Sequence, residues 1–539
     1  MKIFLAFLVS VAVSVTGALY LFQPEAFDQL PVNALKKLTL TTSTKPALVV
    51  GFSAGKSQKE DIDFLIESVV ENKFEAAFYK GFAGGLLAEL DSRKRAGAVA
   101  FFDPSNSEPQ VLVFVPVKEI ESFTDMLTEN AGFKIDADGK TGTRDWSDEE
   151  QIYFETRENY FYFSNHKETF ARIIDNPAVW MRDIPSNYNV GLVYDAEQVP
   201  ETIKQLQRYQ LRKGMVDAAS AAAPATVRLD QKSNQEFQDD VIQMFDEIKV
   251  LKFGVDIAPK NRQVELFFQA DGTKSSKLAS LGTRGEQLPQ SRFKRFRDEK
   301  SLANFNMNAP LTEDDVKKFA GVLDKMTKQS DARHERVIKE VRNLLKEATQ
   351  EQSFDGSLSV RSQGPASGDV AVVFHANNTD RAKRLIKELG KPKRIEESAF
   401  GPLVKRPKPD SRVVTIQGLK FYQQLIKSSA QQHQTPSIIF AVGENEVYFG
   451  SGIRPLALMK SCLEAPAVPE WDLQADILFK INLKDDLMMS TIAPGVLTRG
   501  RSQVRGDIAF LKTGVVSRVL VDATVFNTIY EVFRGLGSY

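Results

Sequence analysis

Residues 154–163 read Phe-Glu-Thr-Arg-Glu-Asn-Tyr-Phe-Tyr-Phe, and residues 440–449 read Phe-Ala-Val-Gly-Glu-Asn-Glu-Val-Tyr-Phe. In both stretches, apolar side chains alternate with other residues on either side of a polar Glu-Asn pair. That pattern is typical of a β-hairpin with a tight polar turn. Because the same hairpin pattern occurs twice in one chain, it predicts an internal duplication.

The segments around the two hairpins follow one order in both halves of the sequence. Each half is predicted to begin with a strand and an amphipathic helix, and to continue with a hairpin and a second helix. After the shared hairpin, each half has a helix, a single strand and a closing hairpin. The predicted strands are 47–52, 98–102, 111–115, 190–194, 253–257 and 264–268 in the first half, and 302–307, 356–360, 370–374, 476–480, 507–510 and 517–521 in the second.

Hairpins followed by helices predict an α+β fold of two similar halves, each an antiparallel sheet with helices packed on one face. The expected boundaries are a signal peptide or membrane anchor at 1–23, a first half at 40–283, a linker at 284–300 and a second half at 301–539. Residues 391–412 are rich in proline and lysine and are predicted to form a connection within the second half.

The N-terminus predicts export. Lys2 precedes an uncharged run from Ile3 to Phe22, which resembles a secretory signal and is also long enough to span a bilayer. The segment lacks a clear small-residue cleavage site, so a cleaved signal and an uncleaved anchor both stay open. We expect the rest of the chain in the periplasm or outside the cell, with membrane contact through residues 3–22.

Composition argues against some classes of partner and excludes some kinds of site. Lys plus Arg and Asp plus Glu each total 70, a balance that argues against nucleic acid as a partner. The single cysteine, Cys462, excludes an intramolecular disulfide and a cysteine-based zinc site. Cys462 lies on the apolar face of a predicted helix, so we expect a buried, inert thiol.

Gly51-Phe-Ser53-Ala-Gly55 is the sharpest chemical motif in the chain. A serine between two glycines, after a strand and before a helix, is the local pattern of a hydrolase nucleophile elbow. No His-Gly-Gly motif precedes it, however, and the remaining chain predicts antiparallel hairpins. Read as a phosphate-binding loop, the motif is one residue too short. A small-residue turn between strand and helix is the favoured interpretation.

The other motifs favour structural interpretations. His334-Glu335 lacks the second histidine of a zinc protease helix, because position 338 is isoleucine. Asp136-Ala-Asp138-Gly139 departs from a calcium loop and predicts a polar turn. Residues 292–297 mix arginine with phenylalanine and predict a linker whose arginines pair locally. The histidines, His166, His334, His375 and His433, show no ligand spacing.

The exported N-terminus, the near absence of cysteine and the duplicated hairpin-helix halves make the chain similar to large exported bacterial proteins of unknown function. That resemblance is architectural and transfers no active-site residue. From the residues we assign no catalytic, cofactor-binding or metal-binding side chain. The sequence favours a non-catalytic scaffold or interaction protein of the cell envelope. A carrier of an apolar ligand or lipid and a serine hydrolase using Ser53 are the alternatives.

Overall fold

The computed structural model describes residues 45–52, 89–102, 109–145, 151–212, 239–258, 263–311, 339–384, 411–425, 437–466, 476–482 and 503–522, with short gaps inside 151–212, 239–258 and 339–384. The chain divides into two compact units. Unit 1 contains the described residues up to Ser280 and those from Thr513 onward. Unit 2 contains the described residues from Leu281 to Lys512.

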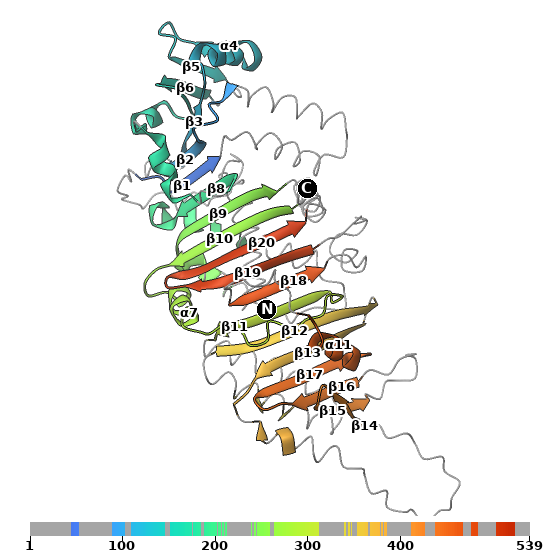
Figure 1. Ribbon diagram of the computed structural model, residues 1–539. Coiled ribbons are helices and arrows are strands. Elements are labelled where there is room, and N and C mark those ends of the chain that lie inside the picture. Colours follow the sequence, from blue (N-terminus) through green and yellow to red (C-terminus); the bar gives the residue numbers. More distant parts are fainter. Residues whose placement is uncertain are drawn as a thin grey trace, which may run out of the picture. The chain divides into compact units, whose positions relative to one another are not determined.

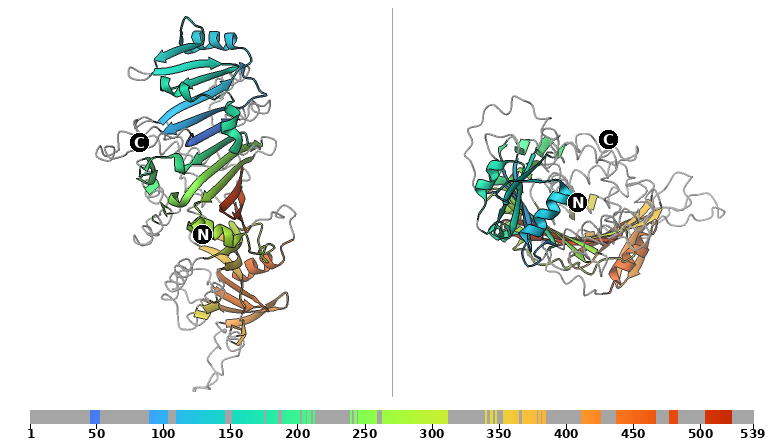
Figure 2. Two further views of the ribbon diagram at one scale, coloured as in Figure 1. Left: turned by 90° about the vertical axis from the view of Figure 1, so that its left-hand side faces the viewer. Right: turned by 90° about the horizontal axis from the view of Figure 1, so that it is seen from above.

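Unit 1 is built on an antiparallel sheet. Its strands pair in the order β4-β5-β6-β7-β3-β2-β1-β8-β9-β10-β20, and Figures 1 and 2 show them from three directions. The strands are β1 (Leu48–Phe52), β2 (Ala96–Phe102), β3 (Pro109–Pro116), β4 (Lys134–Ile135), β5 (Thr141–Asp145), β6 (Gln151–Arg157), β7 (Tyr160–Ser164), β8 (Val190–Asp195), β9 (Ile248–Ala258), β10 (Gln263–Gly272) and β20 (Gly514–Asp522).

Unit 2 is also built on an antiparallel sheet, with the strand order β14-β15-β16-β17-β13-β12-β11-β18-β19. Alternating side chains of each strand therefore point to opposite faces of this sheet. The strands are β11 (Ala303–Pro310), β12 (Ser353–Gly364), β13 (Ser367–His375), β14 (Ser411–Ile416), β15 (Leu419–Leu425), β16 (Ser437–Val442), β17 (Glu446–Gly452), β18 (Ile477–Asn482) and β19 (Gln503–Leu511).

Several helices accompany the sheets, so the α+β class predicted from sequence is consistent with the structure. Strands outnumber helices among the described elements, and the strand pairings in both units are antiparallel. The helical elements with described bounds are α4 (Ile120–Ala131), η3 (Lys167–Arg172), η4 (Pro177–Asp183), η5 (Ala196–Gln198), α7 (Lys277–Gly285) and α11 (Pro455–Leu463). The helices expected after residues 52, 307 and 521 lie outside the described residues.

The two hairpins predicted at 154–163 and 440–449 are confirmed. Residues 151–164 form the β6–β7 pair and residues 437–452 form the β16–β17 pair. In the first, Glu158 adopts a φ of 51°, the left-handed conformation that two-residue hairpin turns require. Strand pairs β4–β5 and β14–β15 were not predicted, because a short polar strand and a connection rich in proline and lysine carry weak alternation.

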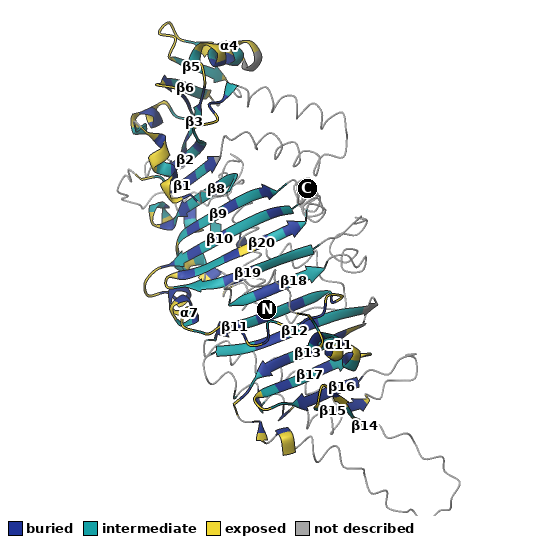
Figure 3. Cartoon of the chain, viewed as in Figure 1, coloured by how far each residue is buried: buried dark blue, intermediate teal, exposed yellow. Residues whose placement is uncertain are grey.

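The core of unit 1 covers its inner strands on both faces. One cluster joins Val49, Val99 and Phe101 to Met181 and Ile184 of the η4 region. The opposite cluster contains residues of the alternate positions: Leu48, Ala100, Phe102, Tyr194 and Leu251. Burying a large apolar side chain contributes about 1.5–3 kcal/mol, so these clusters hold the sheet together. Figure 3 shows the buried positions along the strands.

The core of unit 2 lies mainly along the part of its sheet that runs from β14 to β13. Ala371 and Val373 of β13 pack with Leu458, Met459 and Cys462 of α11. A second cluster covers the other sheet face, through residues that include Leu344, Phe374, Tyr422 and Phe440. Cys462 is 1% exposed, which confirms the expected buried thiol.

Candidate functional site

One face of strands β11 and β12 is polar although it is buried. Asn304, Asn306 and Asn308 alternate along β11 and are 5%, 6% and 3% exposed. Their register partners on β12 are Ser359, Ser357 and Asp355. Cross-strand partners present their side chains on the same face. The two strands therefore join into one buried polar surface in the middle of the unit 2 sheet.

A segment that we call the strap, residues 289–301, covers this polar surface. Its contacts with β12 come from every second residue of the strand, Asp355, Ser357, Ser359 and Arg361, which share one face. Ser357 Oγ donates to the Phe296 carbonyl at 2.8 Å, and Arg361 Nε donates to Asp298 at 3.0 Å. Strand β11 holds both ends of the strap: Asn304 Nδ2 donates to the Asp298 carbonyl and Asn308 Nδ2 to the Pro289 carbonyl.

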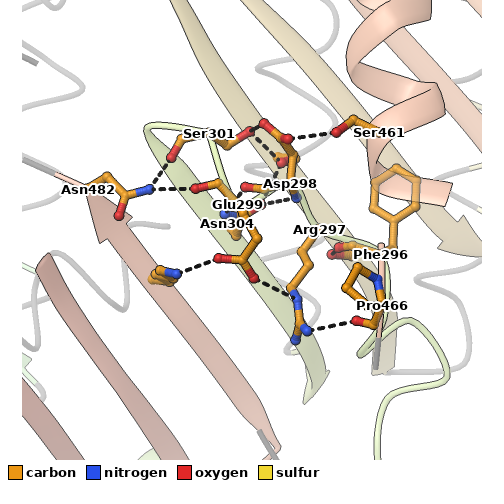
Figure 4. A network of polar contacts seen from close by, with 12 residues as sticks. Phe296, Arg297, Asp298, Glu299, Ser301, Asn304, Ser461, Pro466 and Asn482 are labelled. Carbon is orange, nitrogen blue, oxygen red and sulfur yellow. Dashed lines mark hydrogen bonds and ion pairs between the residues drawn. The ribbon is translucent and has the colours of Figure 1, made fainter. Parts of the chain in front are cut away.

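Asp298 is the centre of the contacts at the C-terminal end of the strap (Figure 4). Its carboxylate accepts hydrogen bonds from Ser461 at 2.7 Å, from Ser301 at 2.8 Å and from Arg361 at 3.0 Å. Burial alone would raise the pKa of Asp298, which is 3% exposed. The hydrogen bonds from Ser461, Arg361 and Ser301 outweigh burial and hold its pKa below the usual range.

The neighbouring residues tie the strap to other segments of unit 2 (Figure 4). Glu299 forms an ion pair with Lys480 of β18 at 2.8 Å and with Arg297 at 3.4 Å. Arg297 Nη2 also donates to the Pro466 carbonyl at 2.9 Å, 169 residues along the chain. Asn482 Nδ2 donates to the Ser301 carbonyl. The strap is therefore fixed from α11, from β12 and from β18.

The N-terminal end of the strap borders a small polar pocket. Arg292 forms an ion pair with Asp355 at 3.6 Å and donates to His375 Nδ1 at 2.9 Å. His375 Nε2 lies 2.9 Å from Asn377 Oδ1. Arg292 Nη1 also lies 3.2 Å from His375 Nε2, so the hydrogen-bond roles of the two ring nitrogens depend on the tautomer. The residues lining the pocket are Leu288, Pro289, Arg292, Asn308, Ser353, Asp355, His375, Ala376 and Asn377.

Asp355 is the buried carboxylate of this pocket, with a side chain that is 10% exposed. Burial raises the pKa of Asp355, and bonds from Ser291 and Arg292 compensate in part. The pKa of Asp298 is therefore lowered and that of Asp355 is raised, although both carboxylates lie on the surface that the strap covers. The difference follows from the number and length of their hydrogen bonds, because burial is the largest influence on both.

The motifs singled out in the sequence do not meet at this site. Ser53, His334 and His433 lie outside the described residues. Asp138 accepts the backbone N–H groups of Lys140 and Thr141, so Asp136–Gly139 forms the predicted polar turn.

Arg297 pairs locally with Glu299, as expected. Arg292 does not, because its carboxylate partner Asp355 is distant in sequence.

The residues that build the site were missed at the level of sequence, although a signal exists. Asn304-Phe-Asn-Met-Asn308 and Asp355-Gly-Ser-Leu-Ser-Val-Arg361 both place a polar residue at every second position. Such alternation predicts a strand with one polar face. A polar strand face is normally assigned to solvent. The covering strap, which precedes β11 in the chain, is what reverses that assignment.

Within the described ranges, no group of three or more His, Cys, Asp or Glu residues is arranged to hold a metal ion. None of the helices in the part of the chain that the structure describes is long and apolar enough to cross a membrane. No protein-family model, no curated protein and no solved structure matches this chain. Its function must therefore be inferred from its own residues.

Proposed function

We propose that this chain is a non-catalytic, exported protein of the cell envelope with a scaffold or interaction role. We further propose that it consists of two similar halves, each an antiparallel sheet with helices packed on one face. The halves would present two related surfaces to a partner, which is a geometry suited to clamping or bridging rather than to turnover.

The repeated strand order is the single observation that carries this proposal. Unit 1 contains the run β6-β7-β3-β2-β1-β8-β9. Unit 2 contains the run β16-β17-β13-β12-β11-β18-β19. In both runs the first strand in chain order lies between a hairpin of the next two strands and the last two strands of the run, and a second hairpin lies beyond the first. An independent origin of so specific an order is improbable, since many orders satisfy the rules of strand connection.

The polar groups of unit 2 support a structural role for the site. Ser301 and Ser461 each donate a hydrogen bond to Asp298, and Arg361 completes the cluster. A nucleophile needs a base aimed at a free reacting position. In this cluster the carboxylate instead holds neighbouring segments in place. Such a network favours a fixed surface, which is what an interaction protein requires.

Native mass spectrometry of the full-length protein, gently extracted from its own host's envelope, tests the proposal. We expect a complex with another protein at fixed stoichiometry. A stoichiometric small-molecule adduct of lipid-like mass would replace the proposal with the carrier alternative. Labelling of Ser53 by an active-site serine probe would replace it with the hydrolase. A matched chain lacking residues 3–22 serves as the control for export, and it should remain in the cytoplasm.

N-terminal sequencing of the extracted protein tests the export step separately. A mature chain that begins near residue 23 identifies a cleaved signal, whereas an intact Met1 in the membrane fraction identifies an anchor. Recovery of the intact chain in the cytoplasmic fraction contradicts export. This result does not depend on whether a partner is found.

A further inference from the structure

The pocket at the N-terminal end of the strap has room for a molecule of a few heavy atoms. Its volume is about 160 Å³, close to that of cavities that hold a benzene molecule. Leu288, Pro289 and Ala376 provide an apolar wall, and polar side chains line the remainder. An apolar wall with a few convergent polar groups is the usual composition of a ligand site.

Asn308 brings an unsatisfied acceptor to this pocket. The residue is 3% exposed, and its Nδ2 donates to the Pro289 carbonyl at 2.6 Å. A flipped amide would place Oδ1 against that carbonyl oxygen, so the orientation is fixed. No described group donates to Asn308 Oδ1. Buried polar atoms without a partner are rare, and a bound donor is a common reason for one.

Asp355 adds a second, weakly satisfied acceptor. It is the register partner of Asn308, so both side chains lie on the same sheet face. Ser291 donates to Asp355 Oδ1 at 2.7 Å. The contacts of Oδ2 with Arg292 are long, at 3.4 Å to the backbone nitrogen and 3.6 Å to Nε. Arg292 also donates to His375, so its guanidinium is shared between His375 and Asp355.

We propose that this pocket binds a small primary amine in its protonated form, with the ammonium group between Asn308 Oδ1 and Asp355 Oδ2 and a short hydrocarbon chain against Leu288, Pro289 and Ala376. An ammonium group carries three donors and one positive charge, which meet both acceptors and the buried carboxylate. An anion would face the Asp355 carboxylate. This inference goes beyond the scaffold role and does not depend on export or duplication.

Matched ligands of one size test the proposal on the purified full-length protein. n-Propylamine at pH 7, n-propanol and propionate differ in charge and in donor number while keeping a three-carbon chain. Isothermal titration calorimetry and ligand-observed NMR should detect binding of n-propylamine, with propanol and propionate at least about tenfold weaker. Tighter binding of propionate, equal binding of all three, or no detectable amine binding overturns the proposal.

Two variants locate the binding. Asp355→Asn keeps the shape of the side chain and removes its charge, so n-propylamine affinity should fall at least about tenfold. Glu444→Gln removes an exposed carboxylate of unit 2 outside the pocket and should leave affinity unchanged. An equal loss in both variants, or no loss in Asp355→Asn, overturns the proposal.

A crystal of the unaltered protein soaked in n-propylamine gives a readout that does not depend on the folding of a variant. Density for the amine between Asn308 and Asp355 supports the proposal. An ordered water alone at Asn308 Oδ1, in a crystal whose soak exceeds the measured dissociation constant, overturns it.

Discussion

The inner strands of the two units are covered in different ways. In unit 1, Val49 and Val99 are buried under Met181 and Ile184, an apolar layer on an apolar face. In unit 2, the strands β11 and β12 present Asn and Ser side chains to the strap, a polar layer on a polar face. The strand neighbours are similar, since β1 lies between β2 and β8 and β11 lies between β12 and β18.

Apolar burial and polar burial constrain a structure in different ways. Apolar contact depends on area and volume and tolerates exchange between similar side chains. A buried polar contact depends on the identity and direction of each group, because an unmatched donor or acceptor is costly. Unit 1 should therefore tolerate conservative changes under its cover, whereas unit 2 should not.

Asp298→Asn should have the largest effect. The change keeps the size of the side chain but leaves Arg361 without its carboxylate, which is bonded at 2.8 Å. Loss of one partner of a buried ion pair costs about 3–5 kcal/mol. Hydrogen exchange of the β11 and β12 amides in increasing urea measures this loss in the free energy of unfolding. Glu299→Gln, at an exposed carboxylate of the same strap, is the matched control and should cost less than about 1 kcal/mol. Equal costs would contradict the assignment of Asp298 as the centre of the network.

The destabilisation in Asp298→Asn should depend on pH. The pKa of Asp298 in the folded protein is lowered, whereas an aspartate in an unfolded chain titrates near about 3.9. The carboxylate therefore contributes its stabilisation above that value, and the contribution is lost as the pH falls through the lower, folded value. The stability difference between the protein and the variant should be constant from about pH 5 to 8 and shrink below about pH 4. A difference that does not change with pH would mean that the charge is irrelevant.

Ser359→Ala tests a neutral polar contact under the strap. Ser359 is 0% exposed, and its Oγ lies 2.6 Å from Asn304 Oδ1 and 2.9 Å from Ser301 Oγ. Loss of the hydroxyl leaves buried neighbours unsatisfied, at a cost of about 1–3 kcal/mol. Chemical denaturation with hydrogen exchange assigns the loss to unit 2. Stability equal to that of the parent protein would show that the polar surface tolerates deletion.

Met181→Leu is the conservative exchange in the apolar cover of unit 1. Met181 is 3% exposed and lies close to β1, where a Cβ on Gly51 would be 3.2 Å from its sulfur. A swap of similar volume should cost less than about 1.5 kcal/mol. Hydrogen exchange of β1 and β2 measures it. A cost above that of Ser359→Ala would reverse the contrast between the two units.

Labelling of Cys462 measures how often unit 2 opens, and it needs no substitution at the cysteine itself. Burial raises the pKa of Cys462 to about 12, so the reactive thiolate is scarce at neutral pH. Iodoacetamide at pH 8 should therefore label the folded protein very slowly and the unfolded chain readily. Mass spectrometry follows the reaction. Faster labelling in Asp298→Asn than in Met181→Leu would link the thiol to the polar surface, and fast labelling of the parent protein would contradict its burial.

The sequence predicts the hairpins better than it predicts the site. Residues 154–163 combine alternation with a polar turn, so local geometry alone defines the pairing. The strap lacks such a local signal: the partners of Arg292 and Arg297 include Asp355 and the Pro466 carbonyl, which only the folded chain brings near. The alternation along 304–308 indicates a polar strand face. A face exposed to solvent and a face covered by another polar segment have the same alternation, so the sequence does not distinguish them.

Because β20 is synthesised long after the other strands of unit 1, the sheet of unit 1 is completed late. β20 pairs with β10 from Gln263↔Asp522 to Asp271↔Gly514, and Asp271 and Thr513 are 242 residues apart in the chain. At synthesis rates of about 5–20 residues per second, β10 leaves the ribosome on the order of tens of seconds before its partner. During that interval the ten-residue strand β10 is an open sheet edge, the kind that pairs with other chains.

The nascent protein therefore passes through a state in which the first-made unit is the last to be completed. Anything that holds the chain extended or shields that edge, such as a chaperone, protects it from joining a neighbouring copy. A chain that stops before Gly514 keeps the edge open permanently.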